Sequence, residues 1–304
     1  MSITRRDVLK GAAALSILGA SPNLSVAQIK VGNATLSTVS DGNLTLPGDF
    51  IFETVPHDDL SPILTEFNLS RDQLTPECNL ALYQDGERNV LFDVGSGPDF
   101  MPSAGKIVDS LDQFGLAVED ITHVVFTHAH PDHLWGLLDD FDDPLFSEAQ
   151  YLISQNEWDY WWNPNTVDSL PDSLKPFAVG AKRRLDVIEG VVEFIKDGQE
   201  IIPGIAAVST PGHTPGHMSF EVRNGSNSTM ILGDAIGNHH IAFKKPSWPS
   251  GSDQDRELGI KSRNMLFDRI TSENMNVIGF HLPNGGIGKV DVTSDGYRFL
   301  EGEI

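Results

Sequence analysis

The sequence has 304 residues, of which 39% are hydrophobic and 8% aromatic, and this fits a soluble globular protein with a sizeable core. Its 43 acidic and 21 basic residues give a formal net charge of −22, which argues against binding to nucleic acids or to anionic membranes. Cys78 is the single cysteine, so the sequence excludes an intramolecular disulfide.

The first 27 residues have the pattern of an export signal. Arg5 and Arg6 precede an apolar stretch over 11–20, and small residues lead up to Ala27. The apolar stretch is too short to span a bilayer, and the arginine pair resembles signals of the twin-arginine type. A cytoplasmic protein with a basic start is the alternative. We predict cleavage after Ala27, a periplasmic or secreted protein, and one domain over 28–304 without a membrane span.

Strands joined by turns are predicted for the part that follows. The run 29–40 alternates loosely and ends at the turn 41–43, which predicts a hairpin. Residues 44–76 are rich in Pro, Asp and Leu and predict an arm or long loop. This segment is a candidate contact for a homodimer, and an ordinary surface loop is the alternative. A second hairpin is predicted over 78–93, and the apolar spacing over 103–114 predicts a helix.

The middle of the chain contains an aromatic cluster. Ser154 and Glu157 match the capping-box pattern at the start of a helix. That helix carries four aromatic residues, which are Trp158, Tyr160, Trp161 and Trp162. The pattern leaves open whether the cluster belongs to the core or lines a ligand pocket.

Strands and helices alternate through the second half as well. Helices are predicted over 173–187 and 256–270, and strands over 191–195, 205–210, 218–222, 229–232 and 277–280, with two more within 286–300. Because no flexible linker or solenoid-type repeat separates these segments, they predict one layered α/β domain.

The segment 127–133, with the sequence THAHPDH, is the central functional motif. It directly follows the apolar run 121–126, which predicts a buried strand that ends in a loop. Histidine and aspartate together suit Zn²⁺ and its first-row neighbours, whereas Ca²⁺ and Mg²⁺ prefer oxygen alone. Four ligands this close in sequence cannot all reach one ion with good geometry, so the motif predicts two ions.

Three further candidate ligands each follow directly after a predicted strand. They are His213 in TPGHTPGH, Asp234 in ILGD and His281 in GFHLP. Because the ends of adjacent strands lie along one edge of a sheet, they can converge on the four candidates in the central motif, which are His128, His130, Asp132 and His133.

In this combination and order, the motifs resemble those of the metallo-β-lactamase superfamily. The resemblance covers roughly residues 30 to 300 and includes Asp93 in FDVG. It implies a four-layer αββα sandwich with the metal site at one edge of the packed sheets. It also implies a division of the ligands: His128, His130 and His213 hold one ion, Asp132, His133 and His281 hold the other, and Asp234 bridges them together with a shared water or hydroxide.

The expected chemistry is hydrolysis. Two close cations lower the pKa of a shared water and stabilise charge that develops on a carbonyl or phosphoryl oxygen. Asp132 and Asp234 are expected to serve catalysis as well as metal binding. Asp93 is expected to orient a ligand imidazole, and His217 to support the site without binding metal. Zinc is the expected metal, although these ligand types do not separate it from Mn, Fe, Co or Ni.

Two less specific segments, 39–47 and 285–300, resemble exported hydrolases of the methyl parathion hydrolase type and their lactonase relatives. The resemblance implies an aromatic substrate pocket at Phe100, Trp161 and Phe177. We therefore expect a lactonase for small-molecule substrates, acyl-homoserine lactones included, with phosphotriester cleavage as a side activity. The alternatives are a β-lactamase, a thiolester hydrolase of the glyoxalase II type, and a periplasmic metal-binding protein without turnover.

Overall fold

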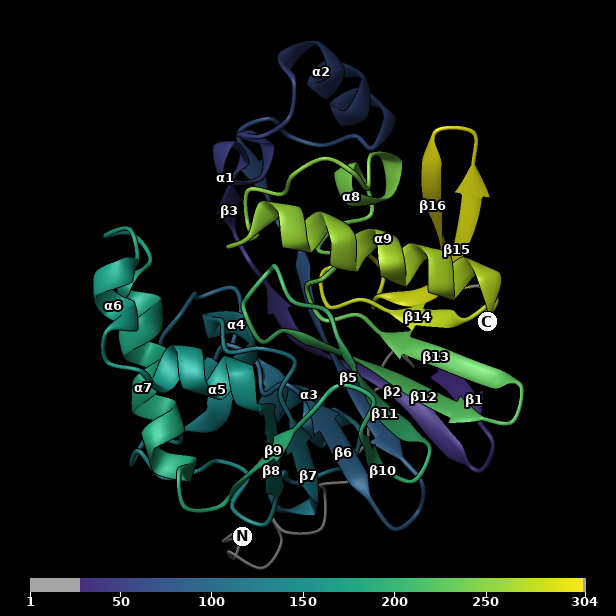
Figure 1. Ribbon diagram of the computed structural model, residues 1–304. Coiled ribbons are helices and arrows are strands. Elements are labelled where there is room, and N and C mark those ends of the chain that lie inside the picture. The colour runs from purple at the N-terminus through teal and green to yellow at the C-terminus, as the bar shows by residue number, and fades with distance from the viewer. Residues whose placement is uncertain (1–27, 303–304) are drawn as a thin grey trace, which may run out of the picture.

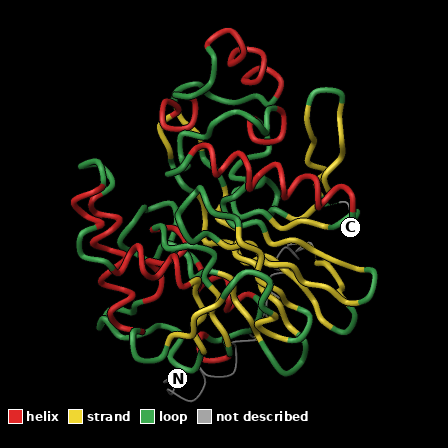
Figure 2. Tube along the Cα trace, in the orientation of Figure 1, coloured by secondary structure: helices red, strands yellow, loops and turns green. Residues whose placement is uncertain are grey.

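Two seven-stranded sheets pack face to face, with helices on their outer faces (Figure 1 and Figure 2). The computed structural model describes residues 28–302, so the predicted export signal lies outside the described residues. The first sheet has the strand order β1-β2-β5-β6-β7-β8-β9, and the second runs in sequence order from β10 to β16. This arrangement confirms the four-layer αββα sandwich implied by the resemblance.

The elements have the following bounds. The first sheet consists of β1 (Gln28–Val31), β2 (Ala34–Asn43), β5 (Glu77–Gln84), β6 (Asn89–Phe92), β7 (His123–Val125), β8 (Gln150–Ser154) and β9 (Val192–Ile195). The second consists of β10 (Glu200–Ile202), β11 (Ile205–Ser209), β12 (Met218–Asn224), β13 (Asn227–Ile231), β14 (Asn276–Ile278), β15 (Ile287–Thr293) and β16 (Gly296–Glu301). A separate pair is β3 (Leu46–Pro47) with β4 (Gln73–Leu74). The helices are α1 (Gly48–Phe52), α2 (His57–Glu66), α3 (Ile107–Gln113), α4 (Pro131–Leu134), α5 (Gln155–Trp162), α6 (Thr166–Ser169), α7 (Lys175–Ile188), α8 (Ile241–Lys244) and α9 (Arg256–Ser272), with 3-10 turns at Val118–Asp120 and Trp135–Leu137.

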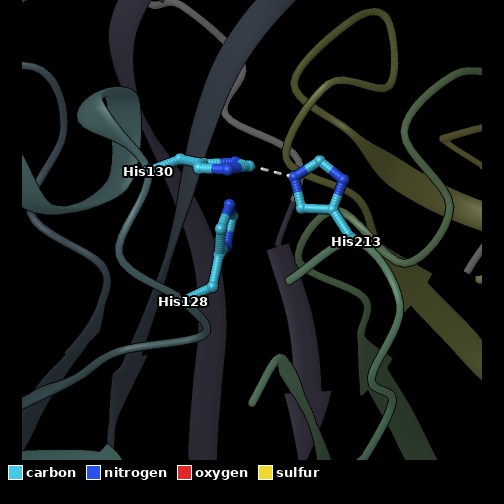
Figure 3. A group of neighbouring side chains, drawn as sticks. All are labelled: His128, His130 and His213. Carbon is cyan, nitrogen blue, oxygen red and sulfur yellow. Dashed lines mark hydrogen bonds between the residues drawn. The ribbon is translucent and has the colours of Figure 1, made fainter. Parts of the chain in front are cut away.

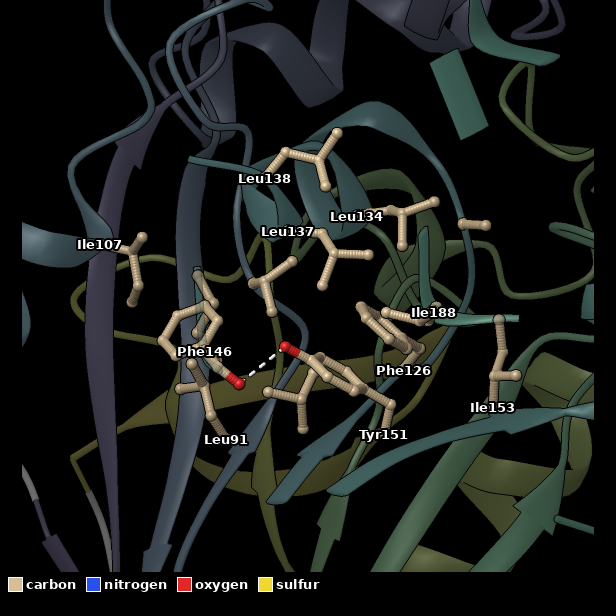
Figure 4. Packing of buried hydrophobic residues seen from close by; sticks show 14 of the residues in the cluster. Leu91, Ile107, Phe126, Leu134, Leu137, Leu138, Phe146, Tyr151, Ile153 and Ile188 are labelled. Atoms are coloured by element: carbon tan, nitrogen blue, oxygen red, sulfur yellow. Dashed lines mark hydrogen bonds between the residues drawn. The ribbon is translucent and has the colours of Figure 1, made fainter. Parts of the chain in front are cut away.

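The central strands are buried on both faces, which explains their nearly continuous apolar sequences. In β5, Leu80 and Leu82 pack in an outer core with α3, α5 and α7, whereas Ala81 packs in the core between the two sheets. Figure 4 shows part of the outer core, where the buried Tyr151 hydroxyl donates to the carbonyl of Phe146 at 2.8 Å. Helices α8 and α9 cover the outer face of the second sheet in the same way.

The first predicted hairpin exists, but its turn is elsewhere. Strands β1 and β2 pair around residues 32–33, and β2 continues through 41–43, where the turn was predicted. The reason is that Asp41 is fully buried and uses its carboxylate inside the fold. That carboxylate accepts four backbone hydrogen bonds of 2.7–3.0 Å, from the amides of Ser96, Gly105, Lys106 and Ile107. The same bonds hold residues before Ile107 out of the helix that was predicted over 103–114.

The prediction of an arm or long loop over 44–76 is wrong, because this segment forms helices and a strand pair. It contains α1, α2 and the β3–β4 pair, and it has a small apolar core of its own that includes Phe52, Leu60 and Ile63. The segment lies beside α8 at the top of Figure 1. Its proposed role in a homodimer stays a prediction. Within residues 28–302, no helix combines the length and the apolar composition that crossing a bilayer requires.

Candidate metal centre

The seven predicted ligands come together where strands of both sheets end. They lie in the loop after β7, on α4, and in the segments that follow β11, β13 and β14. Their ligand atoms form two groups, and within each group all of these atoms lie within 4.8 Å of one another. The first ligand group is His128, His130 and His213, and the second is Asp132, His133, Asp234 and His281.

The first ligand group consists of three imidazoles that face one another (Figure 3). His130 Nδ1 lies 2.9 Å from His213 Nε2. The centre of the His128 ring lies 4.7 Å from that of His130 and 4.8 Å from that of His213. Three imidazole nitrogens can thus meet at one ion, as in a three-histidine metal site.

The second ligand group mixes imidazoles with carboxylates. His281 Nε2 lies 3.2 Å from Asp132 Oδ2 and 3.4 Å from Asp234 Oδ2. His133 Nε2 lies 3.3 Å from the other carboxylate oxygen of Asp234. Asp234 Oδ2 is also 3.4 Å from His213 Nε2, which belongs to the first group. Asp234 therefore stands between the two groups, where a bridging carboxylate would have to be.

Hydrogen bonds behind the ligands decide which imidazole nitrogen is free. Asp93 accepts from the Thr127 amide at 2.7 Å, from the Thr127 hydroxyl at 2.8 Å and from His133 Nδ1 at 2.7 Å. Because the Thr127 hydroxyl donates to Asp93, it accepts from His128 Nδ1, 3.1 Å away. His281 Nδ1 donates to a backbone carbonyl in β5 at 2.7 Å. In these three imidazoles, Nε2 is left to bind an ion.

His217 contacts Asp234 from behind. The amide of Asp234 donates to His217 Nε2 at 2.9 Å, so the ring proton is on Nδ1, which donates to the Thr210 hydroxyl at 2.8 Å. The Thr210 hydroxyl then donates to Ser219 at 3.0 Å, and Ser219 donates to the carbonyl of Leu232 at 2.9 Å. This buried chain of hydrogen bonds begins and ends on the segment that carries Asp234, and so it fixes the position of that segment.

The two groups differ in protonation. Burial lowers the pKa of His130 to about 3 and the pKa of His128 well below its ordinary value, so both imidazoles are neutral at pH 7. Burial also acts against charge on His133, but the carboxylates of Asp132 and Asp234 outweigh it and raise the pKa of His133 well above its ordinary value. Without metal, His133 in the second group therefore carries an extra proton at pH 7. His128 and His130 in the first group do not.

The donor atoms fit divalent cations of the zinc type. Among the described residues, the buried atoms of the two groups without a hydrogen-bond partner are His213 Nδ1 and three candidate metal-binding atoms, which are His128 Nε2, His133 Nε2 and Asp234 Oδ1. Buried polar atoms without partners are costly, and a bound cation would satisfy all three. Imidazole nitrogen combined with carboxylate oxygen suits zinc and its first-row neighbours.

Two further carboxylates reach the site, and sequence reasoning missed both. Asp253 Oδ1 lies 3.5 Å from His213 Nδ1, and Asp253 Oδ2 pairs at 2.8 Å with the buried Arg263. No pattern in the polar segment around Asp253 singles it out.

The capping role predicted for Glu157 is wrong, because Ser154 makes no side-chain capping bond and Glu157 is fully buried beside the ligand loops.

A cavity of about 470 Å³ opens onto both ligand groups. Phe100 and Phe177, which were predicted to line a substrate pocket, line this cavity, and their role toward a substrate stays a prediction. The folded segment 44–76 forms a large part of the wall, and the apolar side chains that it contributes are Leu44, Leu46, Phe50, Ile51, Leu69 and Leu74. Three neighbouring polar residues that sequence reasoning did not assign to the site also line the cavity, which are Asn238, His239 and His240.

The pocket role predicted for Trp161 is wrong. Trp161 is 1% exposed and does not belong to the described residues that line the cavity. Its indole donates to Glu157 at 2.6 Å, and its ring centre lies 5.6 Å from that of His130. Trp158 is buried in the same outer core. Trp161 therefore supports the site from behind rather than lining the cavity, and Trp158 belongs to the core.

The chain is similar to proteins of known family. Residues 76–275 match the family model of the metallo-beta-lactamase superfamily. The uncharacterized protein YobT of Bacillus subtilis is 31% identical over 183 residues, which are 57% of this chain and 72% of that protein. An N-acyl homoserine lactonase of a Bacillus species is 26% identical over 153 residues, and here the match spans 50% of this chain and 53% of the lactonase.

Two solved structures resemble the fold over most of its length. AidC, a dizinc quorum-quenching lactonase in complex with a product, has a TM-score of 0.84 and 25% identity, and the match covers 90% of this chain and 96% of that one. A hydrolase of the beta lactamase superfamily, AbOPH, has a TM-score of 0.82 with the same coverage. At 23% identity, the second likeness concerns the fold alone.

Proposed function

The chain belongs to the metallo-β-lactamase superfamily, and from this premise we propose that it is a dinuclear metal-dependent hydrolase that opens lactones, acyl-homoserine lactones included. The observation that carries the proposal is the cavity on the two ligand groups. Much of its wall is apolar, and the described residues that line it include no Lys or Arg. Such a cavity suits an uncharged substrate with an apolar tail.

Charge separates this proposal from the alternative enzymes. β-Lactams and glutathione thiolesters carry carboxylates, which are costly to bury without a cationic partner. Apart from the candidate ligands, the acidic residues that line the cavity are Glu77 and Asp253, and the buried Arg263 is already paired with Asp253. Lactones and phosphotriesters carry no charge. The cavity therefore favours a lactonase, with phosphotriester cleavage as a side activity, over a β-lactamase or a glyoxalase II-type enzyme.

The bound metal ions and the protein would have different roles in the reaction. Two divalent ions, when bound, would supply hydroxide from a shared water at neutral pH and stabilise the charge that develops on the carbonyl oxygen. The chain holds the ligands in place, as His217 does for Asp234. Phe100 and Phe177 pack edge to face with ring centres 5.9 Å apart, and Phe177 lies beside His130, so that they form an apolar wall for an acyl chain. Ring opening produces a carboxylate, and the described lining offers no Lys or Arg to retain this product.

The proposal includes the identity of the bound metal and the cellular location of the protein. Zinc in both positions is supported by the nitrogen-rich ligand set and by the likeness to the dizinc lactonase AidC. Export to the periplasm or the medium is supported by the pattern of residues 1–27. Sequencing the N-terminus of protein recovered from culture fractions tests it, because cleavage after Ala27 predicts a chain that begins at Gln28.

A substrate panel tests the activity. Purified, zinc-loaded protein is expected to open acyl-homoserine lactones, with a lower KM for longer acyl chains. It is expected to act on lactoylglutathione and β-lactams with kcat/KM lower by about 100-fold or more, since burying an unpaired charge costs several kcal/mol. Turnover of lactoylglutathione without lactone opening would contradict the proposal. Stoichiometric zinc binding without any hydrolysis would favour the metal-binding alternative.

A further inference from the structure

Glu157 joins the two loops that carry the first ligand group. Its Oε1 accepts from the Ala129 amide at 2.9 Å and from the Trp161 indole at 2.6 Å. Its Oε2 accepts from the Thr214 hydroxyl at 2.7 Å and from the Gly216 amide at 2.9 Å. Ala129 stands between His128 and His130, and Thr214 directly follows His213. Each of the three imidazoles is thus one residue away from a hydrogen bond to the same carboxylate.

The packing around Glu157 leaves little freedom. A Cβ atom at Gly216 would come within 2.0 Å of the Glu157 amide nitrogen, so the loop after His213 needs glycine to approach α5 this closely. On the other side, the Trp161 indole that donates to Glu157 also packs against the His130 ring. The first turn of α5 and both ligand loops therefore form one interlocked unit.

The hydrogen bonds also indicate the charge of Glu157. Burial raises the pKa of its carboxyl. However, three of the four partners, the Ala129 and Gly216 amides and the Trp161 indole, can only donate hydrogen bonds, and such donors favour the ionised carboxylate. The carboxylate is fully buried, and its partners in the described chain include no Lys or Arg. The charge that these donors favour would lie directly behind three imidazoles, which bind an ion as neutral ligands.

We propose that Glu157 is a positioning residue that sets the zinc affinity of the first ligand group without touching the ion. It holds the loops of His128, His130 and His213 at the right spacing, and its charge offsets part of the charge of a cation bound there. This inference rests on the proposed dinuclear site. It goes beyond the proposed activity, because it concerns an outer carboxylate on α5.

The variant Glu157→Gln tests the proposal, because it keeps the size of the side chain, removes the charge and places an amide donor against two other donors. We expect zinc at the first ligand group to bind about 10- to 100-fold more weakly, the usual effect of losing an outer partner of a metal ligand. Zinc at the second group is expected to change much less. The readout is bound zinc, measured by mass spectrometry across graded zinc buffers without substrate. His130→Ala and His281→Ala identify the two binding steps.

Asp41→Asn is the matched control. Asp41 is also fully buried and accepts four hydrogen bonds, but its donors lie outside the ligand loops. This variant is expected to lower the melting temperature and to leave the first-group zinc step in place. The proposal is overturned if Glu157→Gln binds zinc as the wild type does, or if Asp41→Asn weakens the same step equally.

A milder variant keeps the test valid if Glu157→Gln does not fold. Thr214→Val removes one of the four donors and leaves the charge in place. We expect it to weaken the first-group step by a smaller factor, with circular dichroism showing a folded protein. An unchanged first-group step in folded Thr214→Val would overturn the positioning role. Because no substrate is used, these results do not depend on whether the protein opens lactones.

Discussion

The two ligand groups lie side by side at one cavity, but they balance the charge of a bound ion in different ways. The first group offers three imidazoles, and the carboxylates behind its loops belong to Glu157 and Asp253. The second group contains its own carboxylates, and those of Asp132 and Asp234 lie 3.2–3.5 Å from its imidazole nitrogens. The carboxylates of the first group thus all lie behind its loops, whereas the second group has carboxylates among its own ligands in addition to Asp93 behind His133.

This difference determines what limits metal binding at each ligand group. In the first group, His128 Nε2 has no hydrogen-bond partner, and the carboxylates lie behind the loops, so the affinity for an ion depends on loop spacing and on distant charge. The second group is already held together by internal ion pairs, so an ion must displace protons before it binds. Asp234 contacts both groups and is the side chain through which the two ions would affect each other.

The largest effect is expected from Asp234→Asn, which removes the shared charge. Both zinc steps should weaken, and kcat/KM for lactones should fall by more than the about 10- to 100-fold typical of losing an outer partner. Bound zinc and lactone kinetics measure these effects. Asp291→Asn is a control, because Asp291 forms a surface pair with Arg298 at 2.6 Å on β15 and β16. If Asp234→Asn weakened a single zinc step, Asp234 would not be shared between the groups.

The next effect is a difference in pH dependence. Burial alone lowers the pKa values of His133 and His281, but the neighbouring carboxylates raise both well above the ordinary value, so the metal-free protein holds these protons at pH 7. Zinc binding must release them. The second-group affinity should therefore rise with pH, by about tenfold per pH unit for each proton released. His128 and His130 are already neutral, so they contribute no such rise in the first group.

Zinc titrations at pH 6, 7 and 8 measure both slopes. Calorimetry in two buffers of different ionisation enthalpy counts the protons that each step releases. His281→Ala removes the second-group step and identifies it. Equal slopes for the two steps would show that the groups do not differ in protonation as the structure indicates.

The ligands of both groups were predictable because each follows directly after an apolar run. His128, His213 and Asp234 all come within a few residues of a strand end, and strand ends share a sheet edge. The supporting residues were not predictable in this way. Glu157 matched a local capping pattern, but its partners Ala129 and Gly216 lie 28 and 59 residues away in the chain. Local patterns carry no information about such contacts.

Asp41 and Trp161 show the same limit. The sequence around Asp41 is typical of a turn, yet its carboxylate binds amides 55 to 66 residues further along the chain. Trp161 lies in an aromatic cluster that resembles a pocket wall, but its indole reaches the buried Glu157 instead. In both cases a tertiary hydrogen bond overrides the local preference, because a buried polar group must find a partner wherever the fold provides one.

The smallest effect concerns the backbone at Asp234 and compares two glycines. Gly233 and Gly225 both have positive φ, +53° and +61°. A Cβ atom at Gly233 would lie 2.6 Å from His217 Nε2, whereas one at Gly225 would have nothing within 4 Å. Gly225→Ala should therefore cost about 1–2 kcal/mol of unfolding free energy, from the left-handed backbone alone. Gly233→Ala should cost about 1–3 kcal/mol more, because it also crowds the ring that holds the Asp234 amide.

Zinc binding distinguishes the Gly233→Ala and Gly225→Ala variants more sharply than stability does. If His217 shifts, the amide of Asp234 loses its acceptor, and the carboxylate moves relative to both ligand groups at once. Gly233→Ala should therefore weaken both zinc steps by similar, modest factors, while Gly225→Ala leaves both unchanged. Thermal melts and zinc titrations of the two variants measure these effects. Weakening of one step alone would mean that the backbone chain from Leu232 to Asp234 supports a single group, and that the two groups are less tightly joined than their shared carboxylate implies.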